Sequence, residues 1–321
     1  MSTLLCCVIL RGMSEKSKGN LILLLVAVLW GSGFISQKLG NTFMPPMTFN
    51  AVRQLMAGIV LVPIALSGLR KSGYLSKTKN SYAQLTHRRR RLLISGALCG
   101  LFMLIGTTTQ QIGLVTVSAG KSGFISSLYI VLVPIFSVLL GNVVKRRDVV
   151  CVIIAMIGFA IMSLRGGFGA ATTGDWLTLI SAAGFAAQIV TINRYVDKHN
   201  AVAMSLIQFL LCGAVGLIIA IAAEHPTLSA VLSGMPVLLY QTFVPTAGGY
   251  TLQTIGQKYS DSSSAALIMS TEAVFAAIFG ALILHEAMSG REIIGAAIIF
   301  AAIILGQIEP KRKQSRSKSS Q

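Results

Sequence analysis

The chain has 321 residues, of which 54% are hydrophobic and only 12% are charged. Soluble domains carry roughly 25% charged residues, so this composition excludes an ordinary soluble fold. The net charge of +17 would suggest a nucleic-acid surface in a soluble chain. In a membrane protein the same charge is expected from cations on the cytoplasmic side, and we expect no nucleic-acid partner.

Apolar segments near 20 residues long recur along the chain. A helix of about that length crosses a bilayer core of roughly 30 Å. The sequence therefore predicts an all-α polytopic membrane protein with about ten transmembrane helices, at residues 21–39, 47–66, 92–112, 118–141, 149–164, 175–194, 202–223, 234–255, 264–284 and 292–308.

Lysine and arginine are distributed unevenly between the two sides that alternating spans define. In the tails and loops, 22 of the 27 cations fall on one side and four on the other, including Lys38 and Lys121, while Arg53 lies within a span. Positively charged segments stay in the cytoplasm, so the tails at 1–18 and 309–321 are predicted to be cytoplasmic. We expect a multi-pass protein of the inner or plasma membrane.

The two halves of the chain resemble each other weakly. A shift of 155 residues pairs Gly19 with Gly174, Trp30 with Phe185, Arg53 with Gln208 and Gly58 with Gly213. A shift of 139 pairs Leu128 with Leu267 and Phe136 with Phe275, and Gln110 and Gln253 stand in similar local sequences at a slightly different offset. Residues 19–164 and 175–308 are therefore predicted to be two five-helix units joined by a linker at 165–174. Five is odd, so the second unit is inverted, as in many secondary transporters with a site between the halves.

Several short motifs follow one another at characteristic spacing. They are Trp30-Gly31-Ser32-Gly33-Phe34, Asn50-Ala51-Val52-Arg53, Gln110-Gln111-Ile112-Gly113, Ala119-Gly120-Lys121-Ser122-Gly123-Phe124, Glu272-Ala273-Val274-Phe275 and Leu284-His285-Glu286. In these motifs the sequence resembles the drug/metabolite transporter superfamily, specifically the bacterial ten-helix permeases built from two EamA domains. The resemblance covers about residues 19–308. It implies transport of small metabolites, often export of amino acids or related compounds, without naming one substrate.

Two charged residues within the spans are the main candidates for substrate binding or coupling. A charge at that depth is costly and usually faces a cavity or a partner. Arg53 is a candidate clamp for a substrate carboxylate, or else an anchor whose side chain reaches the interface. Glu272 is a candidate for proton exchange or for binding a substrate amine, or else it locks two helices together. A pair between the two residues is a further hypothesis.

Uncharged side chains complete the list of candidates. Gln110, Gln111 and Gln253 are expected to line a polar cavity or to join helices by hydrogen bonds. Trp30 and Tyr129 are candidate aromatic walls for a ligand or ordinary packing residues. Pro134 and Pro245 each remove a backbone hydrogen bond and are candidate hinges or static bends.

Other functions are disfavoured. The second histidine of a zinc-protease motif is missing after His285, where Ser289 stands, and the phosphate-binding Gly-rich motif of ATPases is missing from the sequence. We therefore expect no enzyme activity, no cofactor and no metal, and a gradient as the energy source. The alternatives left open are a lipid-linked head-group translocase and a membrane receptor or assembly subunit without transport.

The expected partners are a small-molecule substrate and the lipid bilayer. The cluster Arg88, Arg89, Arg90 and Arg91 is a topology determinant that can also contact anionic lipids. The oligomeric state is left open, with a homodimer as one candidate.

Overall fold

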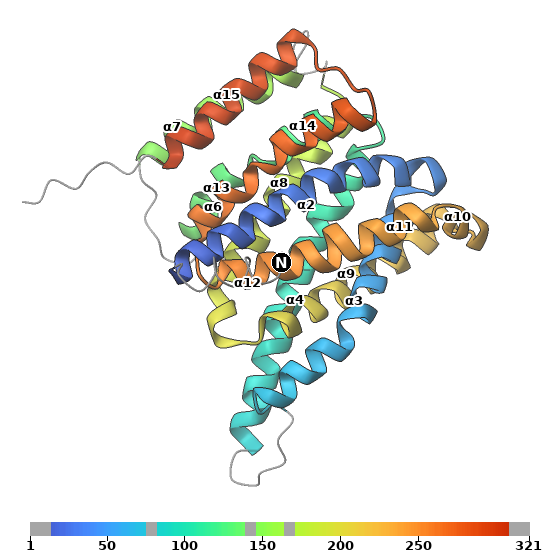
Figure 1. Ribbon diagram of the computed structural model, residues 1–321, viewed down its shortest axis with the longest axis vertical. Helices are drawn as coiled ribbons and strands as arrows, with labels where there is room; N and C mark the ends of the chain where they lie inside the picture. The colour runs from blue at the N-terminus through green and yellow to red at the C-terminus, as the bar shows by residue number, and fades with distance from the viewer. Residues whose placement is uncertain (1–13, 75–81, 139–145, 164–170, 308–321) are drawn as a thin grey trace, which may run out of the picture.

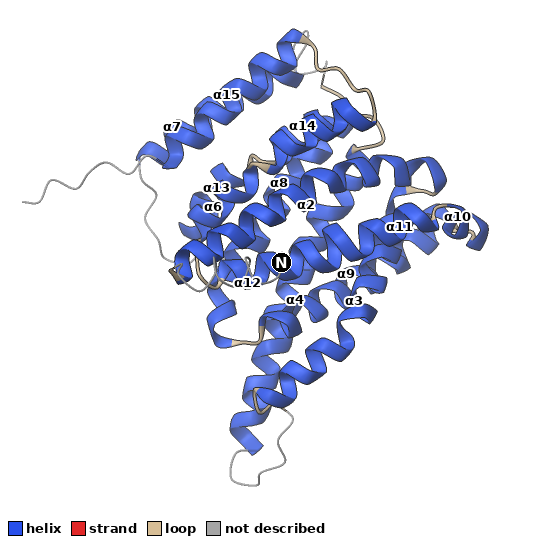
Figure 2. Cartoon of the chain, viewed as in Figure 1, coloured by secondary structure: helices blue, strands red, loops and turns tan. Residues whose placement is uncertain are grey.

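The computed structural model describes residues 14–74, 82–138, 146–163 and 171–307. Within these ranges the chain is helical and contains no strand (Figure 2), as expected for an all-α protein. The helices are α2 (Glu15–Phe43), α3 (Pro46–Lys71), α4 (Tyr82–Gly113), α5 (Ala119–Ser126), α6 (Tyr129–Val138), α7 (Arg146–Ser163), α8 (Thr173–Tyr195), η3 (Val196–Lys198), α9 (Ala201–Glu224), α10 (Leu228–Ser233), α11 (Met235–Gln241), η4 (Thr242–Tyr250), α12 (Thr251–Gln257), α13 (Ser262–Ser270), α14 (Glu272–Ile283) and α15 (Gly290–Gln307).

Seven helical segments of the described chain are long and apolar enough to cross a membrane. The segments include α5 with α6 taken as one span, and α13 with α14 taken as another. The protein is therefore a polytopic membrane protein, and the number ten stays a prediction.

Several predicted spans differ from the helices in detail. The third begins at Tyr82 rather than near residue 92, so Arg88 and its arginine neighbours lie within α4. The fourth and ninth spans are each broken, at Ser127 and Leu128 and at Thr271. The eighth contains a π-helix, η4, between α11 and α12. The glycines of the predicted linker at 166–169 and the basic tail lie outside the described residues.

The helices of the two halves pack against each other in pairs. The helix α3 packs along α9, α4 along α8, and α7 along α15, while α2 contacts α12 and α14 (Figure 1). In the contact between α3 and α9, each helix places a glycine against a leucine of the other. A Cβ atom on Gly58 would lie 2.8 Å from Leu210, and one on Gly213 would lie 2.7 Å from Leu55. Since Leu55 and Leu210 are separated by the same 155 residues as Gly58 and Gly213, these contacts are reciprocal, as a twofold relation between halves requires.

The positions of the helix breaks give a different offset between the two halves than the 139-residue shift inferred from the sequence. Ser118 accepts a hydrogen bond from the backbone of Lys121 at the start of α5, and Asp261 does the same for Ser264 at the start of α13. These N-caps are 143 residues apart, as are Gln110 and Gln253. The 139-residue shift was wrong because it rests on matches between apolar residues, and such matches are common by chance. The N-caps and helix breaks instead show which residue of the first half corresponds to which residue of the second. The corrected shift pairs Tyr129 with Glu272, the first residues of α6 and α14.

Candidate functional site

A cavity lies inside the helix bundle, lined by polar and apolar residues from both halves. It is narrow, with a volume of about 20 Å³ that a water-sized molecule can occupy. We call it the central cavity, and its lining residues are Trp30, Gly33, Phe34, Gln37, Arg53, Gln110, Tyr129, Phe185, Gln188, Ile189, Gln241, Pro245, Tyr250, Gln253 and Glu272.

Arg53 projects from α3 into the central cavity and is only 1% exposed. Its Nε and Nη2 donate to Asn50 Oδ1 at 3.1 and 2.9 Å, and Nη2 also donates to Gln37 Oε1 at 3.3 Å. With the amide of Gln241 in the orientation that satisfies its neighbours, its oxygen accepts from Arg53 Nη1 at 2.5 Å. The guanidinium is thus held by neutral amides, and it forms no ion pair with any carboxylate of the described residues.

Asn50 is itself fixed by α4. Its Nδ2 donates to Thr107 Oγ1 at 3.1 Å and to Thr108 Oγ1 at 3.0 Å. This leaves its oxygen turned toward the guanidinium. Because a buried charge is costly unless it is paired, a fully buried arginine with only neutral partners indicates a site that accepts an anion.

Glu272 is the first residue of α14, directly after the break at Thr271, and is 4% exposed. Its neighbour across the cavity is Tyr129, which also follows a helix break and whose hydroxyl faces the Glu272 carboxyl. That hydroxyl makes no hydrogen bond of standard geometry. The hypothesised ion pair with Arg53 is not formed, although both side chains line the same cavity.

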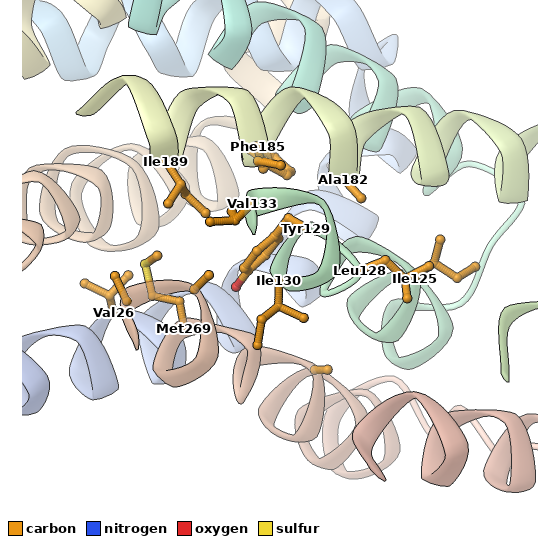
Figure 3. Close-up of a cluster of buried hydrophobic side chains, with 14 of the residues drawn as sticks. Val26, Ile125, Leu128, Tyr129, Ile130, Val133, Ala182, Phe185, Ile189 and Met269 are labelled. Carbon is orange, nitrogen blue, oxygen red and sulfur yellow. The ribbon is translucent and has the colours of Figure 1, made fainter. Parts of the chain in front are cut away.

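The ring of Tyr129 is wedged between helices of the two halves. Figure 3 shows it between Phe185 and Ile189 of α8 on one side and Val26 and Met269 on the other. Tyr129 is 1% exposed and belongs to the largest hydrophobic cluster of the described chain. Packing therefore fixes the ring, while its hydroxyl stays at the cavity.

The aromatic wall of the cavity is built around the π-helix η4. Pro245 has no backbone N–H, which disturbs the regular hydrogen-bond ladder at this point. Trp30 Nε1 donates to the carbonyl of Pro245 at 3.2 Å, and the Trp30 ring lies 4.8 Å from the ring of Tyr250. A side chain on Gly249 would collide with Trp30, since its Cβ would lie 2.6 Å from Trp30 Nε1.

Gln110, Gln188 and Gln253, from three different helices, line the remaining wall. Gln253 Nε2 donates to Gln188 Oε1 at 3.2 Å, and Gln188 Nε2 donates to Gln208 Oε1 at 3.3 Å. Gln110 Nε2 donates to Ser126 Oγ at 3.0 Å. The Oε1 atom of Gln253 is buried without a partner, so the wall retains a free hydrogen-bond acceptor.

The structure brings together most of the residues that the sequence singled out. The central cavity contains Arg53, Glu272, Gln110, Gln253, Trp30, Tyr129 and Pro245. Gln111 lies outside it and joins two helices, because its Nε2 donates to Asn41 Oδ1 at 2.7 Å and to the carbonyl of Gln37. Pro134 lies within α6, away from the cavity, and the break of that span comes earlier, at Ser127 and Leu128.

Six polar or aromatic lining residues were visible in the sequence but were not chosen as site residues: Phe34, Gln37, Phe185, Gln188, Gln241 and Tyr250. Each is a polar or aromatic residue within an apolar span, which is the available signal. What the sequence does not show is which face of each helix meets the cavity.

Comparison with known proteins gives a family. The model of the EamA-like transporter family matches residues 17–164 and again residues 172–306. An uncharacterized transporter from Archaeoglobus fulgidus is 31% identical over 294 residues, covering 91% of this chain and 86% of that protein. The uncharacterized transporter YvbV from Bacillus subtilis is 26% identical, covering 94% and 95% of the two chains. A crystal structure with 17% sequence identity superposes with a TM-score of 0.65 over 92% of this chain and 99% of the other, and it shows the same fold.

Proposed function

Because this chain belongs to the EamA-like transporter family, and is thus a membrane transporter, we propose that it exports amino acids or related compounds by alternating access. The central cavity is the substrate site in this proposal. The two halves of the protein are the inverted units 19–164 and 175–308. The protein lies in the cell membrane, with both chain ends in the cytoplasm. The observation that carries the proposal is one cavity lined by a buried arginine and a buried glutamate that do not neutralise each other.

An α-amino acid presents a carboxylate and an ammonium group a few ångströms apart. Arg53 is the partner for the carboxylate, since charge-assisted hydrogen bonds from a guanidinium to a carboxylate are stronger than those to the neutral amides that it now contacts. Glu272, on the opposite half, is the partner for the ammonium group. The rings of Trp30 and Tyr250 provide an apolar wall for the substrate side chain.

Transport then requires the halves to move around the bound substrate. The breaks before Tyr129 and Glu272 and the π-helix at Pro245 are the points where the helices near the site are not continuous. Such discontinuous helices build the sites of many secondary transporters. We place the hinges there, and we assign the coupling ion as a proton carried by Glu272.

The test is flux in proteoliposomes. Purified protein is reconstituted, and counterflow of a mixture of radiolabelled amino acids is measured with and without a pH gradient. We expect saturable flux for the wild type, loss of flux in Arg53→Gln, and in Glu272→Gln a reduced flux that no longer responds to the pH gradient. Glu15→Gln, which changes an exposed carboxylate on α2, is the matched control and should transport normally.

The outcomes separate the parts of the proposal. Wild-type flux in both cavity variants, with normal folding, would remove the central cavity as the substrate site. Flux that is independent of the pH gradient in the wild type would exclude proton coupling but not transport. Comparison of metabolites inside and outside cells with and without the gene would then identify the substrate.

A further inference from the structure

A second cavity lies between the end of α3, the start of α4, the α8–α9 connection and the end of α12. It measures about 830 Å³ including adjoining open solvent, and it shares no lining residue with the central cavity. We call it the basic pocket. Its lining residues are Ser72, Tyr74, Arg88, Asp197, Lys198, His199, Asn200, Ala201, Val202, Ile255, Lys258 and Tyr259.

Three cations from three separate segments of the chain converge on this pocket. Arg88 lies at the start of α4, Lys198 between α8 and α9, and Lys258 directly after α12. None of them forms an ion pair with a carboxylate of the described residues, and Asp197 is the only acidic residue in the lining. Topology accounts for cations at this end of the bundle, but not for their convergence on one cavity without acidic partners.

Neighbouring side chains hold Arg88 beside Tyr74. The guanidinium of Arg88 lies 4.6 Å from the ring centre of Tyr74, a cation–π distance. Tyr74 is 2% exposed, its hydroxyl is hydrogen-bonded to His199 Nδ1 at 3.0 Å, and its carbonyl accepts two bonds from Arg89. The pKa of His199 is below its ordinary value because of burial and the positive charges of Arg88, Arg91 and Lys198. The pocket is therefore a region of positive potential.

We propose that the basic pocket binds a phosphate-bearing anion, with Arg88, Lys198 and Lys258 as its charged ligands. Phosphate accepts several charge-assisted hydrogen bonds at once, and basic pockets between transmembrane helices bind anionic head groups. The ligand is either the head group of an anionic lipid or a soluble phosphate compound. This site is separate from the central cavity, so its test does not depend on transport.

The experiment measures thermal unfolding of the purified full chain in neutral detergent. In one arm phosphatidylglycerol is titrated into the micelles, with phosphatidylcholine as the lipid that carries no net charge. In the other arm inorganic phosphate is titrated at constant ionic strength. A ligand that binds only the folded state stabilises it by RT ln(1 + L/Kd), where L is the free ligand concentration, so Tm begins to rise near Kd and then grows with the logarithm of the ligand concentration. We expect such a rise in one of the two arms, and that arm identifies the source.

The variants locate the site. We expect each of Arg88→Gln, Lys198→Gln and Lys258→Gln to raise the Kd fitted to the Tm curve about fivefold, and the triple variant to abolish the rise. Arg90→Gln on α4, an exposed arginine outside the pocket lining, is the matched control and should bind as the wild type does. No rise with either probe, or single variants that bind like the wild type, would overturn the proposal. The single variants keep the test valid where the triple variant does not fold.

Discussion

At the residue scale, the chemistry of the site depends on how one arginine is held. Arg53 has hydrogen bonds to Asn50, Gln37 and Gln241, but no carboxylate neighbour. Three neutral amides orient the guanidinium without neutralising its charge. A carboxylate in the same place would bind it more tightly and would remove its capacity to bind an anion from outside.

This argument leads to a prediction for Asn50→Asp. The new carboxylate would stand about where Asn50 Oδ1 now accepts at 2.9 and 3.1 Å from the guanidinium. It would compete with a substrate carboxylate, and a hydrogen bond to a charged group contributes about 1.5–3 kcal/mol. We expect KM to rise about tenfold or more, measured from the concentration dependence of flux in proteoliposomes. Asn50→Ala, which adds no charge, should raise KM less, and an Asn50→Asp protein with the wild-type KM would contradict the assignment of Arg53.

At the element scale, helix contacts in this protein depend on small residues. Without a hydrophobic driving force between helices in lipid, close backbone packing supports association. Gly184 of α8 faces the backbone of α4, where an added Cβ would lie 2.6 Å from the nitrogen of Gly106. Backbone atoms cannot move aside as the end of a side chain can.

We therefore expect Gly184→Ala to destabilise the protein, by about 1–3 kcal/mol as in other overpacked cores. Gly216→Ala on α9 is the matched control, because its Cβ would lie 3.4 Å from Ala51, an ordinary contact. The measurement is thermal unfolding in detergent. Equal Tm values for the two variants would show that α4 and α8 are not packed as described.

A second element depends on its N-cap. Asp261 accepts from the backbone N–H of Ser264 at 3.0 Å and from its hydroxyl at 2.7 Å, and so begins α13. Burial raises the pKa of the Asp261 carboxyl, but these hydrogen bonds lower it more, and the pKa lies below its ordinary value. Asp261→Ala should lower stability by about 1 kcal/mol, and Asp261→Asn by less.

The pH dependence of this cap follows from the lowered pKa. A carboxyl with a lowered pKa in the folded state contributes its full stability above its ordinary pKa of 3.8, and loses it as the pH falls through the folded value. The difference in Tm between wild type and Asp261→Asn should therefore be constant near neutral pH and shrink below about pH 4. A difference that does not change on acidification would mean that the cap does not bind the ionised carboxylate.

At the scale of the whole molecule, composition was sufficient to predict the class and most helices. Apolar length and the positive-inside pattern do not depend on tertiary contacts. The breaks at Ser127 and Thr271 were missed because no proline or glycine stands at either position, and short polar pairs such as Ser126-Ser127 and Ser270-Thr271 also occur inside unbroken helices. The partners of Arg53 were missed because helix rotation is set by packing between the halves. The early start of α4 was missed because its first turns are polar and extend beyond the apolar span.

The two ends of the bundle differ in how the halves are joined. At the end where α3, α5 and α8 begin, three carboxylates of the second half bind groups of the first half. Glu224 accepts from the backbone of Thr48 at 2.7 Å, and Glu286 accepts from Ala119 at 2.8 Å. Asp175, 1% exposed, forms an ion pair with Lys121 at 2.8 Å. In the proposed topology, with both chain ends in the cytoplasm, this is the outer end, and in the proposed transport cycle it is the closed side.

Lys121→Met tests this closed side. Losing one partner of a buried pair costs several kcal/mol, so the outer end should open more often. A cysteine at Phe34, which lines the cavity and packs against Ala119, reports on the opening in a background without other cysteines. We expect an impermeant maleimide added outside to label Phe34→Cys about tenfold faster in the Lys121→Met protein than in the protein with the ion pair intact. The same increase is expected in a protein that carries both Lys121→Met and Asp175→Asn, which leaves no unpaired charge. Lys18→Met, which removes an exposed ion pair with Glu15 on α2, should leave the rate unchanged. Unchanged labelling in both Lys121 variants would mean that this ion pair does not keep the outer end closed.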